Sequence, residues 1–384
     1  MRHHPAPSWI NPAFRLIIGG REWAWPALAA KAACLPAEPL VADGHDLPGL
    51  VSALVAGWER GMPIALLRGG LPAPESMVET GPLLLLETSG TTGTPKRIAR
   101  SFASVLSGIE APRGGDGGRW LLTYDACGFA GLQVLLTALA GGGVLLADPD
   151  MDAAGLARLA VDGHATHISA TPSFWRMLLL SNATPSLTRI TLGGEAVDQA
   201  LLDALASRFP GVPIRCIYAS TELGRLFTVP DGREGFPAAW LSQPPGRYSF
   251  RIWNDMLQVR FADDWQDTGD LVEIVGNRVL FRGRNDFVVN VGGAKVNPAL
   301  AENRLLSLRG ITDALVYGIP NPITGAILAA DIVAPDWQGD DGWRTRVNQA
   351  LADLPTAARP RRLRLVETLP LSAAGKKRRI AEEA

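Results

Sequence analysis

Residues 87–97 read Glu-Thr-Ser-Gly-Thr-Thr-Gly-Thr-Pro-Lys-Arg, and this stretch decides how the rest of the chain is interpreted. Gly90 and Gly93 allow the backbone to turn tightly and to point its N–H groups toward an anion. Lys96 adds a compact positive charge. Further hydrogen-bond donors are the hydroxyl groups of Thr88, Ser89, Thr91 and Thr92. The stretch therefore predicts a loop that binds a polyphosphate.

The segments on either side favour a phosphate loop over a flexible linker of the same composition. Residues 83–86 are all leucine, which is typical of a buried strand, and residues 98–107 predict a helix. A strand, a glycine-rich loop and a helix in this order form a geometry that binds phosphates. The loop is not a Walker A motif, because Lys96 follows Pro95 and precedes Arg97.

The composition predicts a soluble protein of two or three domains, since the 384 residues are 47% hydrophobic and 20% charged. Lys and Arg number 37 against 38 Asp and Glu, so no global field attracts nucleic acid or an anionic membrane. No apolar run approaches the roughly 18 residues that a membrane span needs. The cysteines Cys34, Cys127 and Cys216 are far apart, as expected of reduced thiols. We therefore expect a cytoplasmic protein without a membrane span or a nucleic-acid partner.

The pattern of apolar residues predicts an α/β fold with two domains. Short apolar runs alternate with helical patterns over residues 83–218, which predicts a doubly wound, mainly parallel sheet. Period-two segments over about 225–282 predict an antiparallel β subdomain. The expected domains are a large N-terminal core, residues 1–285, and a small mobile α+β lid, residues 286–384. In such sheets ligands bind beyond the carboxyl ends of the strands, where we expect the loops at Thr88, Gly193 and Ala219.

The first 80 residues carry no chemical motif. They predict helices over residues 25–33 and 47–60. This region contributes to the predicted core but not to the predicted site.

Two motifs at the ends of predicted strands have the residue types that bind a nucleotide. Residues 218–222, Tyr-Ala-Ser-Thr-Glu, combine an aromatic face, two hydroxyl groups and a carboxylate. These groups can stack on a base, contact a phosphate and hold Mg²⁺. Residues 192–195, Leu-Gly-Gly-Glu, contain glycines that would let a planar ring lie against the backbone.

Three motifs toward the carboxyl end add charged groups. Asp270 ends the sequence Trp-Gln-Asp-Thr-Gly-Asp at the start of a predicted strand, where its carboxylate can accept both hydroxyl groups of a ribose. Residues 282–286, Arg-Gly-Arg-Asn-Asp, bring cations to the junction with the lid. Lys376 lies in a loop of small residues close to the end of the chain.

In their order and spacing these motifs resemble the adenylate-forming superfamily, which includes acyl-CoA synthetases, the adenylation domains of nonribosomal peptide synthetases and firefly luciferase. The resemblance covers roughly residues 83–379 and rests on TSGTTGTPK, YASTE, DTGD, GRND and SAAGK. Within the superfamily the chain looks closest to a compact acyl-CoA synthetase or acyl-carrier-protein ligase. The region before the phosphate loop is shorter than in most members.

The resemblance implies a role for each motif. The residues implied to bind the β- and γ-phosphates of ATP are Thr88, Ser89, Gly90, Thr91, Thr92, Gly93 and Lys96. Those implied to surround the adenosine are Gly193, Gly194, Glu195, Tyr218, Ala219, Ser220, Asp270 and Arg284. Thr221 would contact the α-phosphate, Glu222 would hold Mg²⁺, and Lys376 would bridge the substrate carboxylate and the α-phosphate.

The implied reaction is the ATP-dependent activation of a small carboxylic acid to an acyl-adenylate, with release of pyrophosphate. Two anions meet in this step, so Lys96, Lys376 and Mg²⁺ must neutralise their charge. The acyl group would then pass to the thiol of coenzyme A or of the phosphopantetheine on an acyl carrier protein. Asp286 matches the family's hinge, and the thiol would pass near Gly292 and Gly293.

Some departures from the family pattern bear on the substrate. Gly128 stands where members often carry histidine, which predicts a wider acyl pocket, and Asp125 lies three residues from the position of an aspartate in amino-acid-activating members. The basic residues 376–379, apart from Lys376, fit contact with a carrier protein or coenzyme A, or a solvated tail. Transfer to an amine, amino-acid adenylation and a degenerate nucleotide-binding protein without turnover remain alternatives. The acid itself is not fixed by the sequence.

Overall fold

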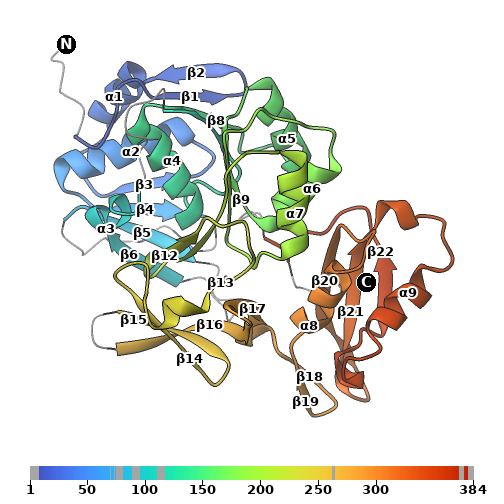
Figure 1. Ribbon diagram of the computed structural model, residues 1–384. Helices are drawn as coiled ribbons and strands as arrows, with labels where there is room; N and C mark the ends of the chain where they lie inside the picture. Colours follow the sequence, from blue (N-terminus) through green and yellow to red (C-terminus); the bar gives the residue numbers. More distant parts are fainter. Residues whose placement is uncertain are drawn as a thin grey trace.

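The computed structural model describes residues 8–69, 71–72, 74, 81–88, 96–109, 117–261, 264–371 and 376–378. It has a large N-terminal α/β part, an antiparallel β subdomain and a C-terminal α+β part, as Figure 1 shows. The predicted α/β fold with a small C-terminal α+β part is therefore confirmed, and this part, which we expected to be a lid, is called the lid below.

The strands of the α/β part form two sheets rather than the single sheet expected from the sequence. The larger sheet has eight strands in the order β12-β11-β10-β9-β7-β8-β1-β2. All its neighbouring pairs are parallel except β1 with β2 and β11 with β12. Its strands are β1 (Arg15–Ile18), β2 (Arg21–Ala24), β7 (Arg119–Leu122), β8 (Val144–Ala147), β9 (His167–Ala170), β10 (Arg189–Gly193), β11 (Ile214–Ser220) and β12 (Gly224–Val229).

The smaller sheet carries the strand before the phosphate loop. Its four strands have the order β3-β4-β5-β6 and comprise β3 (Leu40–Asp43), β4 (Ile64–Leu67), β5 (Leu83–Thr88) and β6 (Lys96–Ser101). Strands β3, β4 and β5 are parallel, and β6 is antiparallel to β5. Residues 40–67 contribute β3 and β4 to this sheet. The N-terminal region, which has no chemical motif, therefore supports the strand that precedes the predicted phosphate loop.

The helix predicted over residues 98–107 is wrong in its first half. Residues 96–101 form β6, and only α3 (Phe102–Leu106) is helical, with Ser101 as its N-cap. Tertiary contacts hold β6 extended, because Arg97 pairs with the buried carboxylate of Glu87 on β5. The predicted phosphate loop therefore lies in the sequence between two antiparallel strands, β5 and β6.

Four helices of the core begin after a residue whose side chain satisfies one of their first N–H groups. Asp46, Asp152, Thr171 and Asp198 accept hydrogen bonds at the N-termini of α2, α5, α6 and α7. The helices are α1 (Trp25–Ala33), α2 (Leu47–Arg60), α4 (Phe129–Gly141), α5 (Ala153–Asp162), α6 (Pro172–Leu180) and α7 (Gln199–Arg208). The two helices predicted in the first 80 residues are confirmed by α1 and α2.

The antiparallel subdomain and the lid follow in the chain. The subdomain sheet has the order β13-β17-β16-β15-β14, formed by β13 (Phe236–Pro237), β14 (Ser249–Trp253), β15 (Met256–Phe261), β16 (Asp264–Val275) and β17 (Arg278–Arg284). Strand β16 begins before Asp270, so this residue lies within a strand rather than at its start. The lid contains β18 (Val289–Val291), β19 (Ala294–Val296), α8 (Ala299–Leu306), β20 (Asp313–Asn321), β21 (Gly325–Val333), α9 (Trp343–Ala350) and β22 (Arg362–Leu365).

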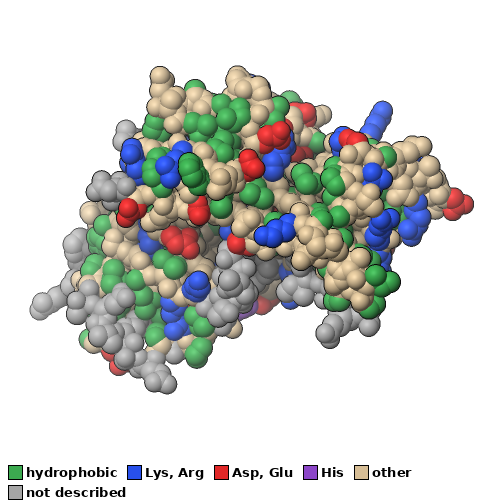
Figure 2. Space-filling view, turned by 90° about the horizontal axis from the view of Figure 1, so that it is seen from below, with side chains coloured by type: hydrophobic (Ala, Val, Ile, Leu, Met, Phe, Trp, Pro, Cys, Tyr) green, Lys and Arg blue, Asp and Glu red, His purple; other side chains and the backbone are tan. Residues whose placement is uncertain are grey.

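The surface carries both signs of charge. On the face in Figure 2, acidic and basic side chains of the described residues are interspersed, in keeping with the formal net charge of −1. Within the part of the chain that the structure describes, no helix has the length and apolar character required to cross a membrane.

Candidate active site

A cleft of about 1330 Å³ brings residues of the core, the β subdomain and the lid together. It joins the carboxyl ends of β5, β10 and β11 with strands β16 and β17 and with the segment around Lys376. The predicted site residues that line it are Thr88, Lys96, Gly193, Gly194, Glu195, Tyr218, Ala219, Ser220, Thr221, Glu222, Asp270, Arg284, Asp286 and Lys376. Parallel strands thus present their carboxyl ends to one cavity, as expected for an α/β sheet.

Two groups of predicted residues are not among the described residues that line this cleft. Ser89, Gly90, Thr91, Thr92 and Gly93 of the phosphate loop fall outside the part of the chain that the structure describes. Gly292 and Gly293 form the turn between β18 and β19, with φ of 59° and 87°. A side chain at either position would be strained in this turn.

Tyr218, Asp270 and Arg284 form a polar wall on the side of the β subdomain. Arg284 Nη1 donates to Asp270 Oδ1 at 3.1 Å, and the Tyr218 hydroxyl donates to Asp270 Oδ2. The ring of Tyr218 lies between Phe227 and Phe281, with both centroid distances 5.0 Å. These contacts fix the wall before any ligand binds, and the carboxylate of Asp270 retains capacity to accept further hydrogen bonds.

Burial perturbs the titration of this wall. Desolvation raises the pKa of Asp270, although Arg284 opposes this shift. The pKa of Tyr218 is also raised, because its burial and the nearby Asp270 carboxylate disfavour the phenolate. Arg284 also donates to Asp286 Oδ2 at 2.9 Å, so the wall is connected directly to the predicted hinge.

The loop after β10 contacts the segment of Lys376. Gly194 has φ of +85°, and a Cβ atom there would lie 3.3 Å from Lys376 Cε. The Glu195 carboxylate accepts hydrogen bonds from Ser173 N at 3.1 Å, Ser173 Oγ at 2.7 Å and Lys377 N at 2.9 Å. Glu195, predicted to lie beside adenine, thus holds the backbone next to Lys376.

Lys376 extends into the cleft from the C-terminal segment. The side chain remains partly open to solvent, while the protein around it lowers its pKa by desolvation. Glu195 and Asp270 raise this pKa, whereas Arg284 and Arg68 lower it. Two carboxylates and two guanidinium groups therefore act in opposite directions on the pKa of Lys376.

The turn that carries Thr221 and Glu222 is anchored from the smaller sheet. Arg100 on β6 is buried, and its Nη1 donates to the carbonyl oxygens of Thr221 at 2.8 Å and Glu222 at 2.7 Å. This contact depends on β6 being a strand, so it could not be found from a predicted helix. Strands β5 and β6 therefore flank the predicted phosphate loop, and β6 also anchors the turn with Thr221 and Glu222.

The donor set around Glu222 fits a magnesium ion that is bound mainly through a nucleotide. The Glu222 side chain is exposed and faces the cleft. Among the described residues, no group of three or more His, Cys, Asp or Glu side chains could hold a metal ion. One carboxylate, together with phosphate oxygens and water, is a common way to bind Mg²⁺.

Arg68 is a cleft residue that the sequence analysis missed. Its Nε lies 2.6 Å from Asp125 Oδ2, and the two side chains are 17% and 15% exposed. A Cβ atom on Gly128 would be 3.5 Å from Arg68 Cζ, so Arg68 fills part of the wider pocket expected beside this glycine. The useful signal would have been an arginine at the carboxyl end of β4, but β4 was not predicted.

Comparison with known proteins identifies the class to which this fold and site belong. The family model for AMP-binding enzymes matches residues 28–303, and the model for the AMP-binding enzyme C-terminal domain matches residues 301–376. The chain belongs to the AMP-binding enzyme family. The resemblance to adenylate-forming enzymes is thereby confirmed.

Individual relatives are more distant. A probable 2-succinylbenzoate–CoA ligase of Mycobacterium tuberculosis is 29% identical over 385 residues, which cover 93% of this chain and 96% of the relative. A medium/long-chain-fatty-acid acyl-carrier-protein ligase of the same organism is 23% identical, and the match covers 89% of this chain and 75% of that ligase. The solved o-succinylbenzoate coenzyme A synthetase of Bacillus subtilis, in complex with ATP and magnesium, has the same fold, with a TM-score of 0.65, 18% identity and 95% coverage of each chain.

Proposed function

We propose that this protein is an ATP-dependent acid–thiol ligase that forms an acyl-adenylate and passes the acyl group to a thiol. The observation that carries the proposal is the convergence of Lys376, the Tyr218–Asp270–Arg284 wall and the Glu222 turn on one cleft. The two M. tuberculosis relatives are ligases for coenzyme A and for an acyl carrier protein, which supports a thiol as the acceptor.

In the first step, a carboxylate oxygen of the acid attacks the α-phosphorus of ATP. The bond between this phosphorus and the oxygen shared with the β-phosphate breaks, and pyrophosphate leaves. Lys376 lowers the repulsion between the carboxylate and the α-phosphate, and Lys96 stabilises the leaving pyrophosphate. Asp270 accepts hydrogen bonds from the ribose, while Thr221 donates to the α-phosphate. Mg²⁺, held by Glu222, would neutralise phosphate charge.

In the second step, the thiol loses its proton to solvent, its sulfur attacks the acyl carbon, the carbon–oxygen bond to the phosphate breaks, and AMP leaves with the electron pair. We assign residues 1–285 to a core and 286–384 to a lid, with Asp286 at the hinge. The short helix η2 (Asn285–Phe287) links β17 to β18, which supports this division. The turn with Gly292 and Gly293 is not part of the cleft lining, so the proposed thiol path requires the lid to rotate.

The experiment is an exchange of labelled pyrophosphate into ATP across a panel of carboxylic acids. The panel contains 2-succinylbenzoate, other aryl acids, short-chain acids, fatty acids and amino acids, because the relatives act on chemically different acids. We expect exchange that depends on one class of acid and stops when Mg²⁺ is chelated. Binding of ATP without exchange on any acid would favour a non-catalytic nucleotide-binding protein.

The acceptor is determined in a second experiment with the acid found in the first. The enzyme, ATP and the acid are mixed with coenzyme A, a phosphopantetheinylated carrier protein and a primary amine, and the products are identified by mass spectrometry. A thioester as the main product supports the proposal. An amide as the main product would replace it with an amide synthetase.

A further inference from the structure

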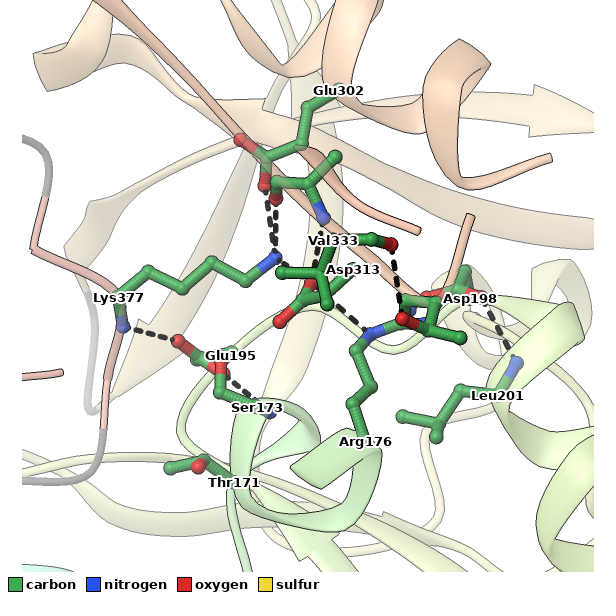
Figure 3. Close-up of polar contacts among 12 residues, drawn as sticks. Thr171, Ser173, Arg176, Glu195, Asp198, Leu201, Glu302, Asp313, Val333 and Lys377 are labelled. Atoms are coloured by element: carbon green, nitrogen blue, oxygen red, sulfur yellow. Dashed lines mark hydrogen bonds and ion pairs between the residues drawn. The ribbon is translucent and has the colours of Figure 1, made fainter. Parts of the chain in front are cut away.

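A cluster of six charged side chains, shown in Figure 3, joins the lid to the core, and five of the six also line the cleft. The core contributes Arg176 on α6, Glu195 after β10 and the α7 N-cap Asp198. The lid contributes a residue of α8, the first residue of β20 and a lysine of the C-terminal segment, namely Glu302, Asp313 and Lys377. Apart from Glu195, which was predicted to lie beside adenine, the cluster has no assigned part in the proposed chemistry, although it adjoins Lys376.

Lys377 fastens the C-terminal segment to the body of the lid. Its Nζ lies 2.7 Å from Asp313 Oδ1 and 3.5 Å from Glu302 Oε1, and it donates to the Ala314 carbonyl oxygen at 2.8 Å. The side chain is only 10% exposed. Burial lowers the pKa of Lys377, but Glu302 and Asp313 more than offset this, so its pKa is raised and the ammonium group stays charged. Lys377 is therefore not part of a solvated tail, in contrast to one interpretation of the basic residues.

Three contacts among the described residues connect this lid cluster to the core. The Lys377 backbone N–H donates to Glu195 Oε1 at 2.9 Å. Arg176 lies with its Nε 3.6 Å from Asp313 Oδ1, and its Nη1 donates to the Thr312 carbonyl oxygen at 3.0 Å. Lys376 is the neighbour of Lys377, so these contacts determine where its side chain enters the cleft.

The charged groups at this junction keep a partner within their own domain. On the core side, Arg176 pairs with Asp198, and Glu195 accepts from both polar groups of Ser173. On the lid side, Asp313 and Glu302 both contact Lys377. Separation of the two domains would therefore leave no uncompensated charge, which is the costly outcome for a buried ion pair. A contact of this type can hold the lid and still be broken in each catalytic cycle.

We propose that Arg176, Asp313 and Lys377 are positioning residues that hold the lid in the orientation for adenylate formation, with Lys376 over Gly194. The proposal rests on the proposed function, because it assigns these residues to the first of its two steps. In this role they act through Lys376 rather than on ATP or the acid. The thiol step requires a different lid orientation and does not use the Arg176–Asp313 contact.

The test compares the two half-reactions in Arg176→Gln, with Arg176→Lys as the conservative variant and Asp353→Asn as the control. Asp353 forms an exposed ion pair with Arg304 on the lid, so its change removes a lid charge away from the junction. We expect Arg176→Gln to lower the kcat of pyrophosphate exchange about tenfold or more, a typical size for coupling between sites. Transfer of the acyl group from added acyl-adenylate to the thiol should stay within about twofold. Arg176→Lys should recover part of the exchange, and Asp353→Asn should change neither step.

A second measurement requires no turnover. Hydrogen–deuterium exchange of the backbone around Thr312 and Lys377 in the free protein should be faster in Arg176→Gln than in the wild type, and unchanged in Asp353→Asn. Equal loss of both half-reactions, or unchanged hydrogen exchange at the junction, would overturn the positioning role. If the wild type itself shows no pyrophosphate exchange with any acid, the proposed function fails, while the hydrogen-exchange result still tests the junction.

Discussion

The nucleotide side and the lid side of the cleft hold their charged groups in different ways. On the nucleotide side, Asp270 and Arg284 are cross-strand partners in one sheet, and Tyr218 is packed between two aromatic rings. On the lid side, Lys376 is positioned through its neighbour Lys377, whose contacts are divided between two domains. The difference fits the proposed mechanism, because a nucleotide site would benefit from rigidity and a lysine used in only one of two steps would have to be able to leave.

The largest expected effect follows from removal of the lid-side charge. Lys376→Ala should lower pyrophosphate exchange by about 10²- to 10³-fold, the usual loss when a group that stabilises transition-state charge is removed. Thiol transfer from supplied acyl-adenylate should be retained. Both rates are measured on the same preparation, and Arg344→Gln, on the exposed side of α9, serves as a lid control. Equal loss in both steps would remove the distinction between the two sides.

Much of the nucleotide side could be predicted because its residues lie in short local motifs. The motif around Tyr218 ends a segment with a clear strand pattern, and the motif around Asp270 lies within another such segment. The structure places both motifs at the cleft. Period-two alternation also indicated the hairpins of the β subdomain, in which a tight turn at Gly276 joins β16 to β17.

The parts that the sequence analysis missed depend on contacts between distant segments. Residues 98–101 were expected to be part of a helix, but pairing with β5 and the bonds from Arg100 to the 221–222 turn make them part of a strand. The division of the core into two sheets could not be seen because β3 and β4 come from a region without motifs. The buried contacts of Lys377 could not be predicted either, because its neighbouring residues in the sequence do not distinguish it from an exposed lysine in a basic tail.

The second prediction concerns the nucleotide side. Asp270→Ala should raise the KM for ATP by about tenfold or more, because a charged hydrogen-bond partner contributes about 1.5–3 kcal/mol. Tyr218→Phe keeps the aromatic packing and removes one hydrogen bond, so it should raise the same KM by only about fivefold. Steady-state exchange at varied ATP concentration measures both. A fall in kcat without a change in KM would show that this wall, like the lid side, serves the chemical step.

The third prediction tests the ion pair on the floor of the cleft. Arg68→Met removes a guanidinium group that acts on Lys376 and leaves the Asp125 carboxylate without its partner, which should reduce kcat/KM for the acid about tenfold. The double change Arg68→Met with Asp125→Asn removes both charges and should recover part of this loss. Thermal unfolding of each variant separates an effect on activity from one on folding. If the double variant is no better than the single one, Arg68 acts on the acid directly rather than by neutralising Asp125.

The smallest expected effect is a shift in pH dependence. Desolvation lowers the pKa of Lys376, and Arg284 and Arg68 lower it further, although Glu195 and Asp270 act in the opposite direction. A lysine with a lowered pKa loses its charge at a lower pH, so kcat/KM for pyrophosphate exchange should fall on the alkaline side before an ordinary lysine would titrate.

Lys376→Arg isolates this effect, because a guanidinium group stays protonated throughout the accessible range. The variant should have lower activity at neutral pH but should lose its alkaline decline, while the pH profile of thiol transfer stays the same as in the wild type. Identical alkaline declines in both proteins would assign the titration to another group. In that case Lys376 would stay protonated across the tested pH range, and the lid would supply its positive charge at every pH at which the enzyme is active.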